Sequence, residues 1–176
     1  KLAWRLSRNN TKTVWVLKLD IRKFFVSVDH EILLRLLRQN LYFDYWNNPS
    51  KDKRRAMALL EEIVRSFYPG LPLGNLTSQL FANIYLNELD QFVKHQLRIR
   101  EYIRYCDDFI ISCRHRETLF NWFRQIQLFL KEQLRLEVHS DKIIIKRYHQ
   151  GVDFLGFVCF PHFRVLRTKT KKRIIS

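Results

Sequence analysis

Hydrophobic and polar residues recur along this chain with two different periods, which separate the expected strands from the expected helices. Residues 14–21, VWVLKLDI, form an apolar and β-branched run that predicts a buried strand ending at Asp20. Residues 29–40, DHEILLRLLRQN, place their apolar positions on one helical face, with Asp29 as the expected N-cap. The same helical spacing predicts helices over residues 54–67, 76–97 and 116–135.

Shorter apolar runs in the second half of the chain predict a hairpin. Two strands, residues 101–106 and 109–113, flank Asp107 and Asp108, which places both aspartates at the turn. Three more short strands are predicted over residues 142–147, 152–160 and 163–168. The Pro- and Gly-dense residues 68–75 predict a loop. Mixed strands and helices indicate one α+β domain, with a mostly antiparallel sheet packed by helices on one face.

Composition narrows the class of protein. The chain has 176 residues, of which 47% are hydrophobic, enough for one domain with a real core. No apolar run approaches the roughly 20 residues of a membrane span, and no signal peptide is visible. The chain opens on Lys1 without Met, which suggests a fragment. Three scattered cysteines (Cys106, Cys113 and Cys159) argue against a disulfide scaffold or a zinc site and favour a reducing, cytoplasmic setting.

Charge is the strongest compositional signal. The chain holds 32 Lys and Arg against 17 Asp and Glu, a formal net charge of +15. Such a balance favours a polyanionic partner, with nucleic acid ahead of an anionic membrane surface, although a passive basic surface stays open. Residues 164–173, RVLRTKTKKR, hold six basic residues and no acid, and suit either phosphate contact or a solvated tail.

Asp20, Asp107 and Asp108 lie at the ends of apolar strands, where burying an unpaired carboxylate is energetically unfavourable. If the strand ending at Asp20 lies beside the hairpin of Asp107 and Asp108, three carboxylates meet and repel one another. A divalent cation removes that repulsion, and a few Asp oxygens with open positions suit Mg²⁺. Two such ions about 4 Å apart catalyse nucleotidyl transfer. The alternative is that Asp107 and Asp108 merely form a polar turn.

Four motifs then resemble a known family. YCDD (residues 105–108), LDIRKFF (19–25), GLPLGNLTSQ (70–79) and DFLGF (153–157) are similar, in order and spacing, to the catalytic and primer-grip motifs of reverse transcriptases. The resemblance is closest to bacterial retron and group II intron-like enzymes. Within these, Gly74, Ser78 and Gln79 resemble the enzymes of diversity-generating retroelements.

The resemblance implies a metal site and its cofactor. Asp20 and Asp107 would be the principal ligands and Asp108 a weaker third, with Ile21 in the same metal-binding set. Two Mg²⁺ ions would be bound, and Mn²⁺ is an alternative. Lys142 matches a family lysine that can protonate the leaving pyrophosphate, and the alternative for it is a solvated lysine at a strand end.

The resemblance also implies a nucleotide site. Phe25 would lie under the deoxyribose and leave no room for a 2′-hydroxyl, unless its ring only packs in the core. Leu73, Gly74 and Asn75 would run beside the incoming nucleotide and its templating base. Leu73 replaces a glutamine that contacts the nucleotide in many relatives, so looser base selection and error-prone copying are expected.

The remaining expectations concern organisation and partners. Leu155 and Gly156 would form the turn that supports the primer 3′ end. Residues 1–160 would be a polymerase palm, similar to a ferredoxin-like or RRM-like sheet, with a remnant of the fingers. Residues 161–176 would start a basic connection toward a missing thumb, so that fingers and thumb are mostly absent.

The expected partners are an RNA template, a DNA or RNA primer, dNTPs and a small basic accessory protein, with no membrane. Two other functions stay open. One is a nucleic-acid-binding fragment with weak or no catalysis. The other is a palm-type nucleotidyl cyclase, which would need no primer.

Overall fold

The computed structural model describes residues 2–8, 10–42 and 51–175. Its backbone contacts divide the chain into two compact units, each discontinuous in sequence. The first unit contains residues 1–20, 98–125 and 139–176, and the second contains residues 21–97 and 126–138. Helix α6, Arg116–Leu134, begins in the first unit and continues into the second.

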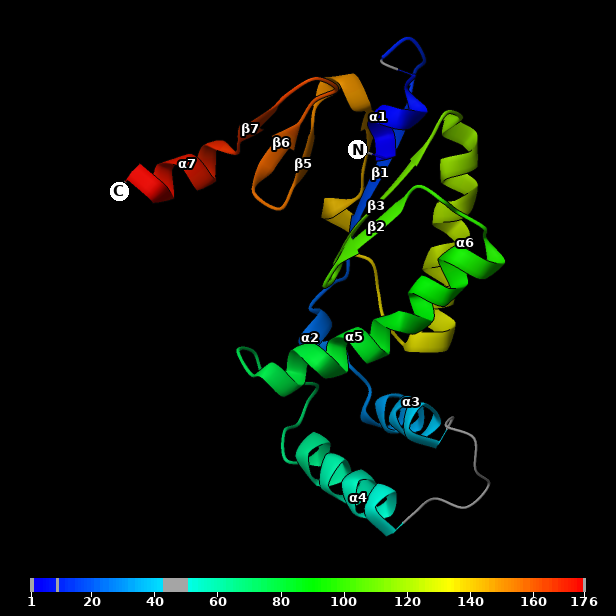
Figure 1. Cartoon of the computed structure of the whole chain (residues 1–176), viewed down its shortest axis with the longest axis vertical. Coiled ribbons are helices and arrows are strands. Elements are labelled where there is room, and N and C mark those ends of the chain that lie inside the picture. Colours follow the sequence, from blue (N-terminus) through cyan, green and yellow to red (C-terminus); the bar gives the residue numbers. More distant parts are fainter. Residues whose placement is uncertain (1, 9, 43–50, 176) are drawn as a thin grey trace. The chain divides into compact units, whose positions relative to one another are not determined.

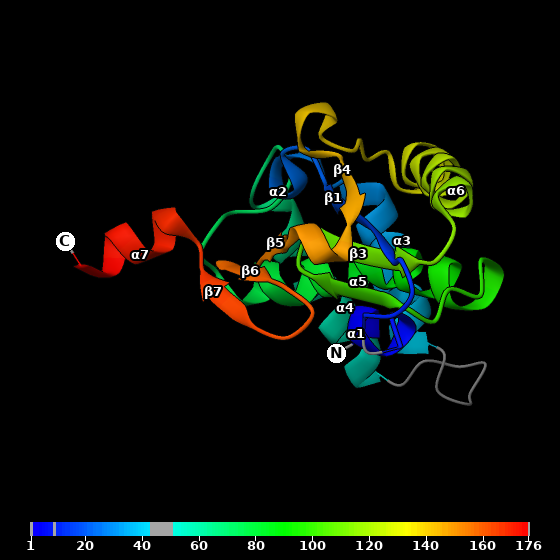
Figure 2. The same ribbon diagram turned by 90° about the horizontal axis from the view of Figure 1, so that it is seen from above.

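A four-stranded antiparallel sheet forms the centre of the first unit (Figure 1). Strand β1, Trp15–Asp20, lies inside it, as its β-branched, apolar sequence predicts. The order is β2-β3-β1-β4, in which β2 is Tyr102–Tyr105, β3 is Asp108–Cys113 and β4 is Ile144–Arg147. Seen from above, β4 runs along β1 (Figure 2). The predicted strands at residues 14–21, 101–106 and 109–113 are therefore confirmed.

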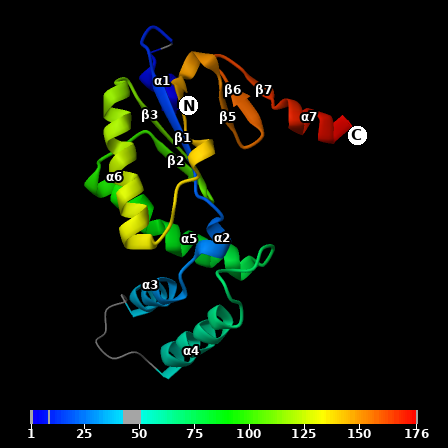
Figure 3. The same cartoon turned by 180° about the vertical axis from the view of Figure 1, so that it is seen from behind.

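Both faces of β1 are buried. Val16 belongs to a cluster with Val14, Tyr148 and Val152, and helix α1, Leu2–Leu6, packs Ala3 and Leu6 against it. On the opposite face Leu17 and Leu19 are fully buried. The first part of helix α6, through Gln125, belongs to the same unit as this sheet, and the whole helix can be followed from behind (Figure 3). The pattern predicted helices on one face of the sheet only. Because α1 covers the Val16 face, that part of the prediction is wrong.

A second, three-stranded sheet follows in the same unit, where the pattern predicted a continuation of one sheet. Residues 152–160, expected as one strand, form a hairpin of β5, Val152–Phe154, and β6, Phe157–Cys159, which turns at Leu155 and Gly156. Strand β7, Arg164–Leu166, completes the sheet. Helix α7, Thr168–Ile175, follows, and nearly all of its described side chains are exposed, so this basic segment is ordered as a helix yet open to solvent.

The second unit is helical. Its helices are α2, Phe24–Ser27; α3, His30–Tyr42; α4, Lys51–Arg65; α5, Leu76–Gln91; and the π-helix η1, Phe92–Gln96. Residues 43–50, which precede α4, lie outside the described residues. Tyr85 crosses the core of this unit, where its hydroxyl donates to the Leu134 carbonyl (2.8 Å) and accepts from the Asp29 N–H (3.3 Å).

The predicted N-cap at Asp29 is confirmed. Its Oδ1 accepts hydrogen bonds from the N–H groups of Glu31 (2.9 Å) and Ile32 (3.0 Å), which open α3. Its Oδ2 accepts from the Arg135 guanidinium at 2.6 Å. One carboxylate thus satisfies two orphan donors of the helix and ties its start to a distant arginine.

Asp29→Ala is expected to destabilise the fold by about 1–2 kcal/mol near neutral pH, because the helix loses this acceptor. Burial alone would raise the pKa of Asp29, but hydrogen bonds from Ile32 and Arg135 hold that pKa below its usual range. A carboxylate with a lowered folded pKa stabilises the protein above its unfolded pKa of about 3.9, and the effect is lost as the pH falls through the folded pKa.

Urea unfolding of both proteins at about pH 7 and about pH 3 measures this dependence, and the free-energy difference should shrink at the lower pH. Asp29→Asn is the matched control, since its amide oxygen keeps the cap while the charge facing Arg135 is lost. Equal differences at the two pH values would contradict the assignment.

None of the described helices has the length and apolar character needed to cross a membrane. All three cysteines are free thiols.

Candidate functional site

The β2–β3 hairpin turns at Cys106 and Asp107. Cys106 has a φ of 52°, and the Arg104 guanidinium donates a hydrogen bond to its carbonyl at 3.0 Å. Tyr105 pairs with Asp108, so Asp108 is the first residue of β3 and not part of the turn, where the sequence placed both aspartates. This geometry leaves Asp107 at the tip and fixes Asp108 in the sheet.

Asp20 and Asp108 lie directly opposite each other in the β1–β3 pair. Side chains of directly opposed residues share one face of a sheet and are neighbours. The prediction that the end of the first strand meets the hairpin is therefore confirmed. Lys18, two positions before Asp20, projects from the same face, and its Nζ lies 3.5 Å from Asp108 Oδ2.

Lys142 reaches the same carboxylates through a short anchored segment. The His139 N–H donates to the Asp20 carbonyl (2.8 Å), and the 3₁₀ turn Ser140–Lys142 follows. The Lys142 ammonium then donates to Asp20 Oδ1 at 2.8 Å. This hydrogen bond raises the pKa of Lys142 above its usual value. Lys142 is half-exposed yet paired, so it is more than a solvated lysine at a strand end.

The carboxylates are not fully neutralised. Burial raises the pKa of Asp107, and the nearby charges of Asp20 and Asp108 raise it further. Asp108 Oδ1 is buried and accepts no hydrogen bond from any described residue. A buried carboxylate oxygen without a partner is costly, so this site favours an additional cation or donor.

Asp20, Asp107 and Asp108 are residue types that bind divalent cations, although their side chains are not close enough together to surround one in this structure. Within residues 2–8, 10–42 and 51–175, no three His, Cys, Asp or Glu side chains are grouped closely enough to hold a metal ion. Asp20 and Asp108 are each paired with a lysine instead. Their hard oxygens, with the orphaned Asp108 Oδ1, are nevertheless the donors that Mg²⁺ prefers. The Ile21 side chain is buried and apolar, so only its carbonyl is a potential ligand.

The predicted sugar-contacting residue lies in the second unit. Phe25 is on the short helix α2 and is partly exposed, whereas the preceding Phe24 is buried. Their rings meet edge to face with centroids 5.3 Å apart. Phe25 thus packs on the core with one side and presents the other side to solvent.

The loop at residues 68–75 exposes the residues predicted to meet the nucleotide. Leu73 is 76% exposed despite its apolar side chain, and Gly74 and Asn75 are exposed beside it. Gly74 has a φ of 90°, and a Cβ placed there would touch nothing within 4 Å. The backbone at Gly74 is therefore open to a ligand.

The predicted primer-supporting turn is present in the first unit. Leu155 and Gly156 join β5 to β6, and Leu155 is 48% exposed. The Gly156 carbonyl accepts a hydrogen bond from the Arg167 N–H (2.9 Å), and the Arg167 guanidinium pairs with Asp153 Oδ2 at 2.9 Å. Arg167 therefore ties the hairpin to the segment that follows it.

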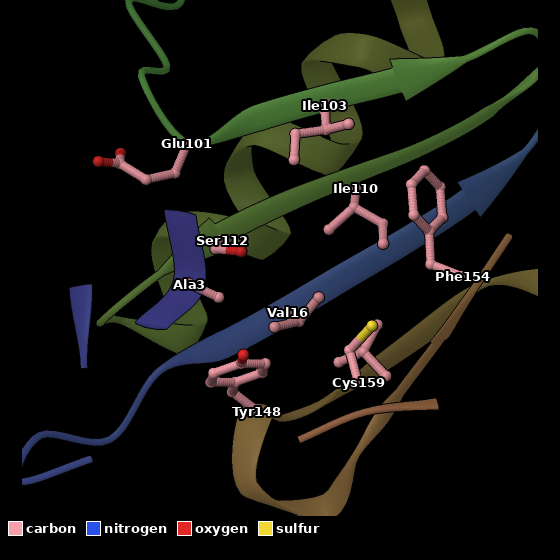
Figure 4. A pocket seen from close by; sticks show the side chains of 10 residues that line it. Ala3, Val16, Glu101, Ile103, Ile110, Ser112, Tyr148, Phe154 and Cys159 are labelled. Atoms are coloured by element: carbon pink, nitrogen blue, oxygen red, sulfur yellow. The ribbon is translucent and has the colours of Figure 1, made fainter. Parts of the chain in front are cut away.

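A mostly apolar cavity of about 200 Å³ lies in the first unit, away from these carboxylates (Figure 4). Val16 and Ile110 of the central sheet face Phe154 and Cys159 of the hairpin across it (Figure 4). None of the three aspartates lines the cavity. The cavity and the group of aspartates are therefore separate features of this unit.

Comparison with known proteins identifies the family. Residues 4–159 match the family model described as reverse transcriptase (RNA-dependent DNA polymerase). The group II intron-encoded protein LtrA of Lactococcus lactis subsp. cremoris is 24% identical over 230 residues, which cover 90% of this chain and 36% of LtrA. The chain thus spans about a third of the length of this curated relative.

Solved structures agree on the fold. Apo telomerase from Candida tropicalis, truncated from its C-terminal domain, superposes with a TM-score of 0.72 at 15% identity, over 94% of this chain and 38% of that one. The foamy viral protease-reverse transcriptase in complex with an RNA/DNA hybrid gives 0.54 at 19% identity, over 92% and 18%. The α+β expectation, with antiparallel strands and helices as in a polymerase palm, is confirmed. Because the family model matches most of this chain, the chain belongs to the reverse transcriptase (RNA-dependent DNA polymerase) family.

Proposed function

We propose that this chain is the catalytic palm of an RNA-directed DNA polymerase that adds dNTPs to a primer 3′-hydroxyl. The observation that carries the proposal is the pairing of Asp20 with Asp108 across two strands, with Asp107 on the adjoining tip. Membership of the reverse transcriptase family supports the reaction class. The net charge of +15 supports an RNA template and a nucleic-acid primer as partners.

In this proposal Asp20, Asp107 and Asp108 would hold two Mg²⁺ ions, or Mn²⁺ in their place, and Ile21 would add its carbonyl. Bound there, the ions would activate the primer hydroxyl and neutralise charge on the leaving pyrophosphate. Lys142 carries its proton on Nζ beside Asp20, and from there it would protonate the leaving pyrophosphate. The Leu155–Gly156 turn supports the primer end.

We also propose an origin in a diversity-generating retroelement, on the basis of Gly74, Ser78 and Gln79. Leu73 is exposed and offers no hydrogen bond to a base, which supports loose base selection and error-prone copying. A retroelement enzyme of this kind implies a small basic accessory protein as a further partner. The free cysteines support a reducing compartment such as the cytoplasm.

Primer extension on an RNA template with dNTPs tests the proposal directly. We expect extension with Mg²⁺, loss of extension when EDTA removes the ion, and recovery when Mg²⁺ is added back. Products should depend on both primer and template, which separates a polymerase from a nucleotidyl cyclase. A purified protein that binds RNA but never extends the primer would contradict the proposal and favour a binding function alone.

Phe25→Ala is expected to admit ribonucleotides. Removing the ring opens space beside the 2′ position, and a steric contact of this size discriminates by roughly 10- to 200-fold. The ratio of kcat/KM for ATP to that for dATP should rise by this factor. Phe163→Ala is the matched control, because Phe163 is an exposed ring in the other unit. Unchanged sugar selectivity in Phe25→Ala would remove the gating role.

A further inference from the structure

The loop at residues 68–75 is joined to the backbone of Phe25. The Leu71 N–H donates a 2.7 Å hydrogen bond to the Phe25 carbonyl, although the two residues are far apart in sequence. Leu71 is buried, with 3% of its surface exposed. The loop is therefore anchored at Gly70 and Leu71, which are buried between the exposed Tyr68 on one side and the exposed Leu73 and Gly74 on the other.

Gly70 makes this approach possible. A Cβ on Gly70 would overlap the Phe25 carbonyl oxygen and lie 2.6 Å from Val26 Cα. These are backbone atoms of α2, which cannot turn aside as the end of a flexible side chain can. Gly70 also has a φ of 71°, where side chains are strained. Gly74 meets no such neighbour, so within this loop the steric demand falls on Gly70 and not on Gly74.

A second tether holds the same peptide. The Gly70 carbonyl accepts a hydrogen bond from His30 Nε2 at 2.7 Å. His30 is the first residue of α3 and is partly buried, and the ring of Tyr68 meets it edge to face at 5.9 Å. Gly70 is thus fixed on one side by His30 and pressed on the other against Phe25.

The Phe25 side of this contact is also rigid. Phe24 is 2% exposed and packs between Phe25 and Tyr85, whose ring centroid is 6.4 Å away. This buried aromatic group holds α2 in place. If the peptide at Gly70 and Leu71 is displaced, the distance between the loop and Phe25 therefore changes. We propose that Gly70 and His30 are positioning residues that set how tightly Phe25 excludes a ribose 2′-hydroxyl. This inference rests on the gating role of Phe25 given under the proposed function.

A displacement of about 1 Å in a substrate-positioning group can change rates by about 100-fold. Gly70→Ala forces the loop and the Phe25 carbonyl apart, so ribonucleotides should gain access while the Phe25 ring is still present. His30→Ala releases the Gly70 carbonyl without adding an atom, and should shift selectivity in the same direction. His30→Gln keeps a donor for that carbonyl and should restore most of the selectivity.

The experiment measures kcat and KM for ATP and dATP in primer extension by the full chain. Gly151→Ala is the matched control, since Gly151 has a similar φ of 78° and a Cβ there would lie 2.7 Å from the Phe160 ring. It lies in the other unit and tests the general cost of such a change. We expect the ATP/dATP ratio of kcat/KM to rise at least about fivefold in Gly70→Ala and His30→Ala, and to stay unchanged in Gly151→Ala.

Each outcome decides between the two claims. If Phe25→Ala relaxes selectivity while His30→Ala and a folded Gly70→Ala keep the wild-type ratio, the positioning role is wrong and the gate stands. If Phe25→Ala changes nothing, the gate and the positioning role both fail. If Gly70→Ala does not fold, His30→Ala and its His30→Gln rescue carry the decision. Equal ratio changes in Gly151→Ala would also overturn the inference, because general loosening would then explain them.

Discussion

Asp107→Asn should reduce primer extension at least about 1,000-fold, equivalent to roughly 4 kcal/mol of transition-state stabilisation. The substitution keeps the shape of the side chain and removes the charge that a divalent cation requires. Asp107 is at the tip of the hairpin, with Asp20 and Asp108 near enough to raise its pKa. An amide at this position leaves the site short of one anionic ligand.

Binding of RNA should change little in the same variant. The chain carries 32 basic residues, so the loss of one negative charge barely alters its attraction for phosphate. Primer extension and a filter-binding or fluorescence-anisotropy titration, done side by side, separate the two effects. Asp52→Asn, the same chemical change at an exposed position of α4, is the control. Primer extension by Asp107→Asn at the wild-type rate would show that Asp107 is not a metal ligand.

Phe109→Ala should lower the free energy of unfolding by about 3–5 kcal/mol, the usual cost of deleting a fully buried ring. Phe109 follows Asp108 in β3, is 0% exposed, and meets the ring of Tyr102 edge to face at 6.1 Å. It pairs with Leu19, the neighbour of Asp20 in β1. The strand positions that carry the two carboxylates therefore rest on this buried ring.

Urea unfolding monitored by circular dichroism measures the loss, with Leu59→Ala as the control. Leu59 lies on α4 and is 58% exposed, so its truncation should change stability by no more than about 0.5 kcal/mol. Phe109→Leu fills most of the space and should lose clearly less than the alanine variant. A loss below about 1 kcal/mol for Phe109→Ala would show that the ring is not packed as described.

The features that sequence predicts well here are local. The cap at Asp29 needs only the two following N–H groups, and the strand ending at Asp20 needs only its own apolar run. The hairpin at Asp107 joins neighbouring strands. Even the opposition of Asp20 and Asp108 follows once a hairpin strand is set beside β1, because register decides which residues share a face.

Features that depend on distant segments were missed or misplaced. The apolar pattern alone predicted one strand over residues 152–160, and only the family resemblance placed a turn at Leu155 and Gly156. The division into two units depends on contacts between segments that are far apart in sequence. Local periodicity does not encode which of these segments meet.

The candidate site shows the same limit. Lys18 faces Asp108 and was not singled out, although its two-residue offset from Asp20 was a usable signal. His30 and Gly70 meet only through the fold, 2.7 Å apart between Nε2 and the carbonyl oxygen. Nothing in the sequence around either residue indicates the other.

The position of β1 within its sheet also determines when the first unit can form during synthesis. β1 leaves the ribosome before both of its antiparallel partners, β3, which begins at Asp108, and β4, which begins at Ile144. At about 5–20 residues per second, this apolar strand waits on the order of ten seconds with both edges unpaired. Unpaired apolar edges are the surfaces through which chains associate wrongly. Chains that stop before Arg147 should therefore be the ones that most need a chaperone.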